Sequence, residues 1–196
     1  MININEPIFT YKEFLSWMEE KVKNYQPKTL ATGEIDLDHY NVLNLKRMKR
    51  IEKTYEVNPS LAILIEKIHK NQTWWVITEP WCGDSAQSLP ALAKIAAINS
   101  KIDFKIMLRD INTDWMNNYL TDGGKAIPIL TAFDENENEL FVWGPRPAPA
   151  QKITNDWKTK KDKSWEEYEK ELHTWYAKDK FHHLEEEFLH ILKNIT

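Results

Sequence analysis

The sequence has a single cysteine and no net positive charge, and it lacks long hydrophobic runs. Its single cysteine, Cys82, excludes an internal disulfide and fits a reducing compartment. The formal net charge of −4 argues against a nucleic-acid-binding role, because phosphate binding needs a basic field. No apolar stretch approaches the roughly 18 residues that a membrane-spanning helix needs. These absences predict a protein with neither nucleic-acid nor membrane partners.

Several sequence signals of other protein classes are also missing. The first residues lack the basic region and apolar run of a secretory signal, so we expect a cytoplasmic protein. There is no Walker loop, dinucleotide glycine motif or serine-hydrolase elbow. We therefore expect no cofactor. The 196 residues can bury a hydrophobic core without disulfides or metals, and the nine tryptophans suggest aromatic-rich packing, a groove, or both.

Helices are predicted at both ends of the chain. Thr10 and Glu13 form a capping box for the first of them. Asn58 and Pro59 supply an N-cap and a proline at the first position of another. The N-terminal helices are expected over residues 10–23, 38–55 and from 58 on, with a loop over 26–37. After Pro149 we expect a helix that carries Ala150, Ile153 and Trp157. A charged connection follows, and then a long amphipathic helix that breaks near Asp179.

The centre of the chain alternates between strands and helices. Strands are expected over residues 74–78, 102–108, 127–133 and 139–143, and helices over 82–98 and 113–120. Crossovers through helices imply parallel neighbours, whereas the polar hairpin loop over residues 134–138 adds antiparallel strands. The fold class is therefore α/β, with a small mixed central sheet flanked by helices.

Cys82 lies between the first of these strands and the helix that follows it. Unpaired backbone N–H groups and the helix dipole favour a thiolate there, so this position predicts a lowered thiol pKa. Ser85 lies one helical turn further on and is expected to donate a hydrogen bond to the sulfur. The negative charge of Asp84 is instead expected to raise the thiol pKa. The alternative interpretation of Cys82 is a buried apolar cysteine.

Four landmarks in the sequence resemble those of the thioredoxin superfamily. They are Trp81-Cys82-Gly83, Pro90 eight residues after the cysteine, Ala126-Ile127-Pro128 before a strand, and Gly144 after the hairpin. The resemblance covers roughly residues 60–160 and is nearest to a bacterial thioredoxin-like subfamily with a Trp-Cys-Gly-Asp-Ser motif. It implies a thioredoxin fold in three parts. These are a helical N-terminal extension (1–58), a thioredoxin-like domain (59–160) and a C-terminal amphipathic helix (161–196) packed on that domain.

The resemblance also implies roles for individual residues. Cys82 matches the attacking cysteine, and Trp81 matches the aromatic residue beside it. Pro128 is expected to be cis and to present the backbone of Ile127 to an extended substrate. The remaining groove residues are Gly144, which would allow close approach of that substrate, and Trp143 and Arg146 at its border. Arg146 would favour an anionic partner, although a surface arginine between prolines is the slightly simpler interpretation.

Two departures from the family pattern limit the chemistry. Ser85 occupies the position of the second cysteine, and Val76 occupies that of the buried acid. Serine cannot resolve a mixed disulfide, so a self-resolving dithiol cycle is excluded. We therefore expect monothiol exchange at Cys82 with a disulfide-containing or thiol partner, either a protein or a low-molecular-weight thiol. The alternative is a redox-inactive binding module that uses the same groove.

The remaining candidate residues and segments are better explained by a structural role than by a catalytic or metal-binding one. His183, Glu187 and His190 have a spacing that can bind a metal, but the polar edge of an amphipathic helix explains them better, so no metal site is predicted. The helical additions at both ends enlarge the surface for a partner or for a homodimer.

Overall fold

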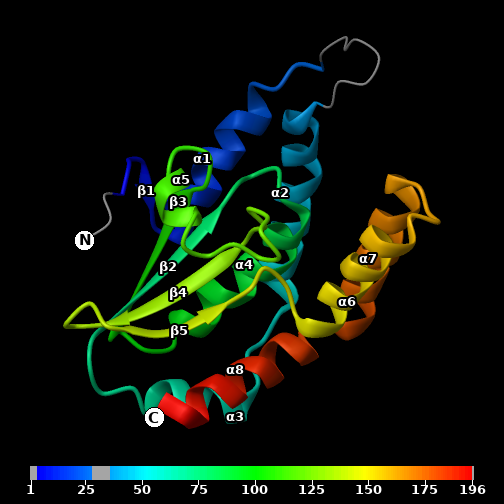
Figure 1. The fold of residues 1–196 in the computed structure, drawn as a ribbon. Helices are drawn as coiled ribbons and strands as arrows, with labels where there is room; N and C mark the ends of the chain where they lie inside the picture. The colour runs from blue at the N-terminus through cyan, green and yellow to red at the C-terminus, as the bar shows by residue number, and fades with distance from the viewer. Residues whose placement is uncertain (1–3, 28–35, 196) are drawn as a thin grey trace.

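The computed structural model describes residues 4–27 and 36–195, and a five-stranded sheet forms its centre (Figure 1). The strands are β1 (Ile8–Phe9), β2 (Gln72–Thr78), β3 (Ile102–Leu108), β4 (Ile129–Asp134) and β5 (Glu139–Trp143), in the order β1-β3-β2-β4-β5. β2 runs parallel to β3, whereas the other three pairings are antiparallel. The mixed sheet is as predicted. The sequence patterns missed β1, a two-residue edge strand paired with β3 through Ile8 and Phe9.

The helices pack around this sheet and around one another. They are α1 (Tyr11–Lys23), α2 (Leu37–Thr54), α3 (Pro59–Glu66), α4 (Gly83–Ala96), α5 (Thr113–Met116), α6 (Ala148–Lys160), α7 (Trp165–Asp179) and α8 (His182–Ile195). α2 packs against α1 and α4, and α3 packs against α8. α6 and α7 pack side by side as a hairpin, on the right of Figure 1.

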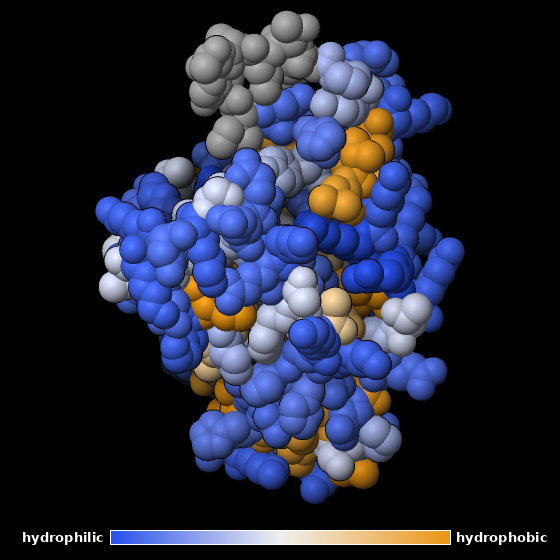
Figure 2. Space-filling model, turned by 90° about the vertical axis from the view of Figure 1, so that its right-hand side faces the viewer, coloured by the Kyte–Doolittle hydropathy of each residue, from blue (hydrophilic) through white to orange (hydrophobic). Residues whose placement is uncertain are grey.

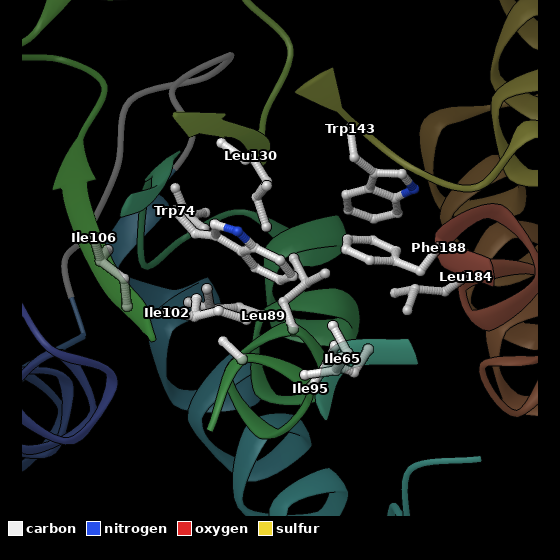
Figure 3. Packing of buried hydrophobic residues seen from close by; sticks show 14 of the residues in the cluster. Ile65, Trp74, Leu89, Ile95, Ile102, Ile106, Leu130, Trp143, Leu184 and Phe188 are labelled. Atoms are coloured by element: carbon white, nitrogen blue, oxygen red, sulfur yellow. The ribbon is translucent and has the colours of Figure 1, made fainter. Parts of the chain in front are cut away.

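Alternating side chains of the strands fill two hydrophobic clusters, one on each face of the sheet. On one face, Trp74 of β2 lies between Leu130 and Leu89, and Phe188 of α8 packs against Trp143 (Figure 3). On the other face, Ile77 and its neighbours pack on the short helix α5. The period of two along β2 therefore directs its side chains to opposite faces, as expected for a strand buried on both sides.

The terminal segments share the larger of these clusters. Phe14 of α1, Met48 of α2 and Phe188 of α8 are all buried in the same cluster as Trp74. Both ends of the chain therefore contribute to the hydrophobic core of the sheet. In the part of the chain described, no helix is long and apolar enough to cross a membrane.

One helix is shorter than the sequence predicted, and the predicted break near Asp179 is present. The helix expected over residues 113–120 ends at Met116, and turns follow it. The C-terminal segment contains two helices, because Lys180 and Phe181 adopt left-handed backbone conformations with φ of 51° and 70° and end α7 there. The loop expected over residues 26–37 lies largely outside the described residues, and α2 already begins at Leu37.

Candidate functional site

Cys82 caps the N-terminus of α4, as its position after β2 predicted. The backbone N–H of Ser85 donates to its Sγ over 3.4 Å. The thiol in turn donates to the carbonyl oxygen of Ile127, 3.2 Å away. Only 8% of the residue is exposed. The sulfur is thus held between the start of α4 and the segment that leads into β4.

This burial overturns the expected lowering of the thiol pKa. Burial, and secondly the charge of Asp84, raise the pKa of Cys82 to about 11, although hydrogen bonds from Ser85 and the charge of Arg146 lower it. The helix N-terminus is a local effect, whereas desolvation comes from elements far away in the sequence. In this conformation Cys82 is a neutral thiol at pH 7, and in this respect it matches the alternative interpretation of a buried cysteine.

Ser85 lies behind the sulfur and not at a surface. It is buried, and its Oγ accepts a hydrogen bond of 2.5 Å from Thr78 Oγ1. Val76, at the position of the family's buried acid, is a fully buried core residue. Glu79, in the loop before Cys82, accepts a hydrogen bond from the backbone N–H of Asp110, and its pKa is raised mainly by burial.

Arg146 and Asp84 form a buried ion pair beside the cysteine. Arg146 donates to Asp84 Oδ2 from Nε and Nη2 over 3.0 and 2.6 Å, and each side chain is 9% exposed. Tyr176 of α7 donates to the other carboxylate oxygen over 2.6 Å, and Arg146 Nη1 donates to Gln151. The interpretation of Arg146 as a surface arginine is therefore wrong. Its charge is already neutralised by Asp84, which leaves little free charge for an anionic partner.

The predicted groove residues Trp143, Gly144 and Pro128 contact other parts of the protein. A Cβ atom on Gly144, whose φ is 120°, would lie 2.3 Å from the carbonyl oxygen of Pro128. Pro128 is buried, and the peptide bond between Ile127 and Pro128 is cis. Trp143 donates its indole N–H to Glu187 of α8 over 2.7 Å and is 5% exposed. The close approach at Gly144 is thus made by the Pro128 carbonyl, and Gly144 also lines a depression away from Cys82.

A pocket of about 360 Å³ opens in front of the cysteine. Four predicted site residues line it together: Trp81, Cys82, Ile127 and Arg146. The other predicted residues lie elsewhere. Ser85 is behind the sulfur, Pro128 is buried beside it, and Trp143 and Gly144 line a second depression against α8. The site is therefore a pocket centred on Cys82, and the groove expected from the resemblance is only partly retained.

The far wall of the pocket comes from residues that the sequence did not single out. They belong to α2 and α7: Leu37, Tyr40, Trp165, Tyr168, Glu169, Leu172 and His173. His173 lies directly over the start of α4, where a Cβ atom on Gly83 would be 3.0 Å from its Nε2. Burial and the charge of Arg47 lower its pKa to about 4, and Gln87 Nε2 lies 3.2 Å from its Nδ1. His173 is therefore neutral at pH 7.

One end of the pocket carries basic side chains. The guanidinium of Arg109 lies 4.7 Å from the ring centre of Trp81 and donates to Asp110 and to the carbonyl of Lys125.

Among the described residues, no group of three or more histidine, cysteine or acidic side chains is placed to hold a metal. Glu187, a member of the metal-like spacing in the sequence, accepts hydrogen bonds from Trp143 and from the backbone of Ala148.

Comparisons with known proteins agree with this architecture. The chain resembles a crystal structure of an HIV epitope-scaffold, with a TM-score of 0.55 and 19% identity over 96% of this chain and 100% of the other. It also resembles a protein of unknown function from Pseudomonas aeruginosa, with a TM-score of 0.57 and 18% identity over 96% of this chain and 99% of the other. No curated protein matches the sequence significantly.

The family assignment rests on a separate match. A family model described as thioredoxin matches residues 31–158, which include Cys82, the segment at Pro128 and Gly144. The mixed sheet and its flanking helices fit the same assignment. The chain adopts a thioredoxin fold and belongs to the thioredoxin family.

Proposed function

We propose that this protein carries out monothiol exchange, in which a disulfide-containing partner binds in the pocket, Cys82 forms a mixed disulfide with it, and an external thiol then releases Cys82. The observation that carries the proposal is that the chain's single thiol lines a pocket large enough for a ligand. The position of Cys82 at the N-cap of α4 supports the same role, because Ser85 N–H stabilises negative charge on the sulfur as it develops.

The proposed chemistry needs only the partner disulfide and an external thiol. The Cys82 proton leaves to solvent base, and the thiolate attacks one sulfur of the partner. A new S–S bond forms at Cys82 as the partner's own S–S bond breaks, and the released thiolate takes up a proton. A second thiol from solution then attacks the mixed disulfide and regenerates Cys82. The cytoplasm of a bacterium, where reduced thiols are abundant, would suit this cycle.

Mass spectrometry of the intact protein tests this proposal. Protein purified without reductant and then incubated with bis(2-hydroxyethyl) disulfide should gain the mass of one thiol moiety on Cys82 and lose it with dithiothreitol. The Cys82→Ser variant should gain nothing. If the wild-type protein forms no adduct even at about pH 9, where an ordinary cysteine is largely ionised, monothiol exchange is not its function.

The burial of Cys82 favours a second candidate function. With a pKa raised to about 11, the thiol is a poor nucleophile at neutral pH, and the pocket would then serve a redox-inactive binding module. The two functions differ in the Cys82→Ser variant, because serine leaves the pocket nearly unchanged in volume. A binding module keeps its biological activity in this variant, whereas an exchange protein loses activity while it retains binding.

A further inference from the structure

We propose that the pocket in front of Cys82 takes a low-molecular-weight aromatic thiol, or the disulfide of one, and excludes an extended polypeptide. This inference rests on the proposed function for its chemistry and adds the class of substrate. It follows from three features of the pocket: the wall that α7 forms, the hydrogen bonds already made where a polypeptide would bind, and the rings that line the space.

The first feature is that α7 closes the side of the pocket opposite the thiol. Tyr168, Leu172 and His173 line the pocket together with Cys82. Polar contacts to α4 hold this helix in place, namely the hydrogen bond from Tyr176 to Asp84 and the contact of His173 with Gln87. A polypeptide that added a strand beside Ile127 would need an open edge along its length. The helix occupies that approach.

The second feature is that the groups a polypeptide would use are already engaged. The carbonyl oxygen of Ile127 accepts a hydrogen bond from the Cys82 thiol, Pro128 is buried, and the Pro128 carbonyl packs closely against the backbone of Gly144. The cavity itself has about 360 Å³, which lies in the range of small-molecule sites, roughly 300 to 1,000 Å³.

The face of the molecule on the side of α6 and α7 also lacks the features of a protein interface. A stable protein–protein contact buries about 1,200 Å² or more in total. Figure 2 views the molecule from the side on which α6 and α7 lie. The described residues on that face are mainly hydrophilic, and the hydrophobic ones gather in separate patches. A broad apolar surface is absent from this part of the described chain, which favours an occupant that lies inside the pocket.

The third feature is the aromatic character of the lining. Tyr40, Trp81, Trp165 and Tyr168 reach the pocket from α2, the loop before α4, and α7. Trp165 is 47% exposed and lies within 3.4 Å of the Tyr40 hydroxyl through its indole nitrogen. Aromatic rings pair with one another by about 0.5–1.5 kcal/mol beyond the burial of their area. An aromatic ring on the ligand would therefore be bound better here than an aliphatic chain of similar size.

Rates of mixed-disulfide formation test the inference. The disulfides to compare are 4,4′-dithiodipyridine, bis(2-hydroxyethyl) disulfide and a disulfide-linked dimer of a ten-residue peptide with one cysteine. Each rate is divided by that of N-acetylcysteine amide with the same disulfide at the same pH, which removes the intrinsic reactivity of the reagent. We expect the normalised rate for the aromatic disulfide to exceed the other two at least tenfold. Equal rates, or a preference for the peptide, would overturn the inference.

Two variants show whether the pocket causes the preference. Trp165→Ala removes an exposed ring from the mouth of the pocket, and Tyr40→Leu removes a second ring with little change in bulk. Either should reduce the aromatic preference at least threefold. Val142→Ala is the matched control, since Val142 is 40% exposed and lies on β5 outside this pocket. A preference that survives in both ring variants would contradict the assigned role of the pocket.

A binding measurement separates the inference from the proposed function. If no disulfide reacts with Cys82, monothiol exchange fails, and titration calorimetry of the Cys82→Ser variant with 4-mercaptopyridine and with 2-mercaptoethanol then tests the pocket alone. Tighter binding of the aromatic thiol would uphold the choice of ligand class. Equal or undetectable binding of both thiols would overturn it.

Discussion

The Cys82 thiol donates its hydrogen bond to the carbonyl oxygen of Ile127, 3.2 Å away. The chain's single thiol is therefore hydrogen-bonded to the segment that leads into β4, and its proton lies between the sulfur and that carbonyl oxygen. This contact stabilises the thiol and not the thiolate, because a carbonyl oxygen can accept a proton donor but repels a negatively charged sulfur. We therefore expect this hydrogen bond to lower the reactivity of the Cys82 thiol at neutral pH.

Alkylation of Cys82 should rise steeply with pH. Since burial raises the thiol pKa to about 11, the rate with iodoacetamide should increase roughly tenfold per pH unit between pH 7 and 10 without levelling off. Protein unfolded in guanidinium should instead level off above about pH 9, because a solvated cysteine ionises near 8.5. Intact mass spectrometry gives both rates. A folded-state profile that levels off near pH 8 would contradict the burial effect.

Asp84→Asn should make the thiol more reactive. The carboxylate of Asp84 raises the thiol pKa, so its neutralisation should lower that pKa and speed alkylation at pH 8 severalfold. The same variant leaves Arg146 buried without its carboxylate partner and should cost about 3 kcal/mol of unfolding free energy in urea.

Two controls make this prediction specific. Asp110→Asn removes an exposed carboxylate paired with Arg109 and should change neither the alkylation rate nor the stability by much. Combining Asp84→Asn with Arg146→Met should recover part of the lost stability, since no unpaired buried charge remains. If the single variant is as stable as the wild type, the ion pair has no structural role.

Gly144→Ala should destabilise the fold strongly. An alanine there would have a positive φ and would place its Cβ 2.3 Å from the Pro128 carbonyl oxygen, which is backbone and cannot move aside easily. We expect a loss of at least about 2 kcal/mol in urea unfolding. Gly123→Ala is the matched control, because Gly123 has a φ of 75° but no neighbouring atom within 4 Å. It should lose only about 1 kcal/mol, and equal losses in the two variants would rule out the steric contact.

His173 should make the protein sensitive to mild acid. Its folded-state pKa is lowered to about 4 from an ordinary value of 6.5, so the folded state favours the neutral ring. The resulting stability is fully present above about pH 6.5 and is lost as the pH falls from there toward about 4. Wild-type protein should therefore lose on the order of 2 kcal/mol more than His173→Gln between pH 7 and 4. Parallel urea titrations at several pH values measure this difference, and identical pH profiles would contradict it.

Most of the fold could be predicted from local patterns in the sequence. The capping box of Thr10 and Glu13 begins α1 as expected. The predicted break of the C-terminal helix near Asp179 is also present. β1 escaped prediction because two residues, Ile8 and Phe9, are too few to show a period. Lys180 and Phe181 end α7 in left-handed backbone conformations. Neither is a glycine, so the sequence does not mark these two residues as the end of the helix.

The site was less predictable because its properties arise from distant residues. The motif located Cys82 at a helix N-terminus, but its burial depends on packing that no local pattern encodes. The partner of Arg146 is Asp84, 62 residues away, so the sequence offered no sign of the ion pair. Trp165, Tyr168 and Leu172 have the spacing of an ordinary amphipathic helix, and nothing in that spacing indicates that they form a pocket wall.

The match to the thioredoxin family ends at residue 158, yet five of the residues that line the pocket opposite Cys82, from Trp165 to His173, lie beyond it. α7 therefore adds part of the pocket wall from outside the matched stretch, whereas the thiol, Ile127 and Tyr40 of the wall lie within it. Exchanging α7 for another helix would therefore change the shape of the space beside Cys82 without altering the sheet or the segment at Pro128.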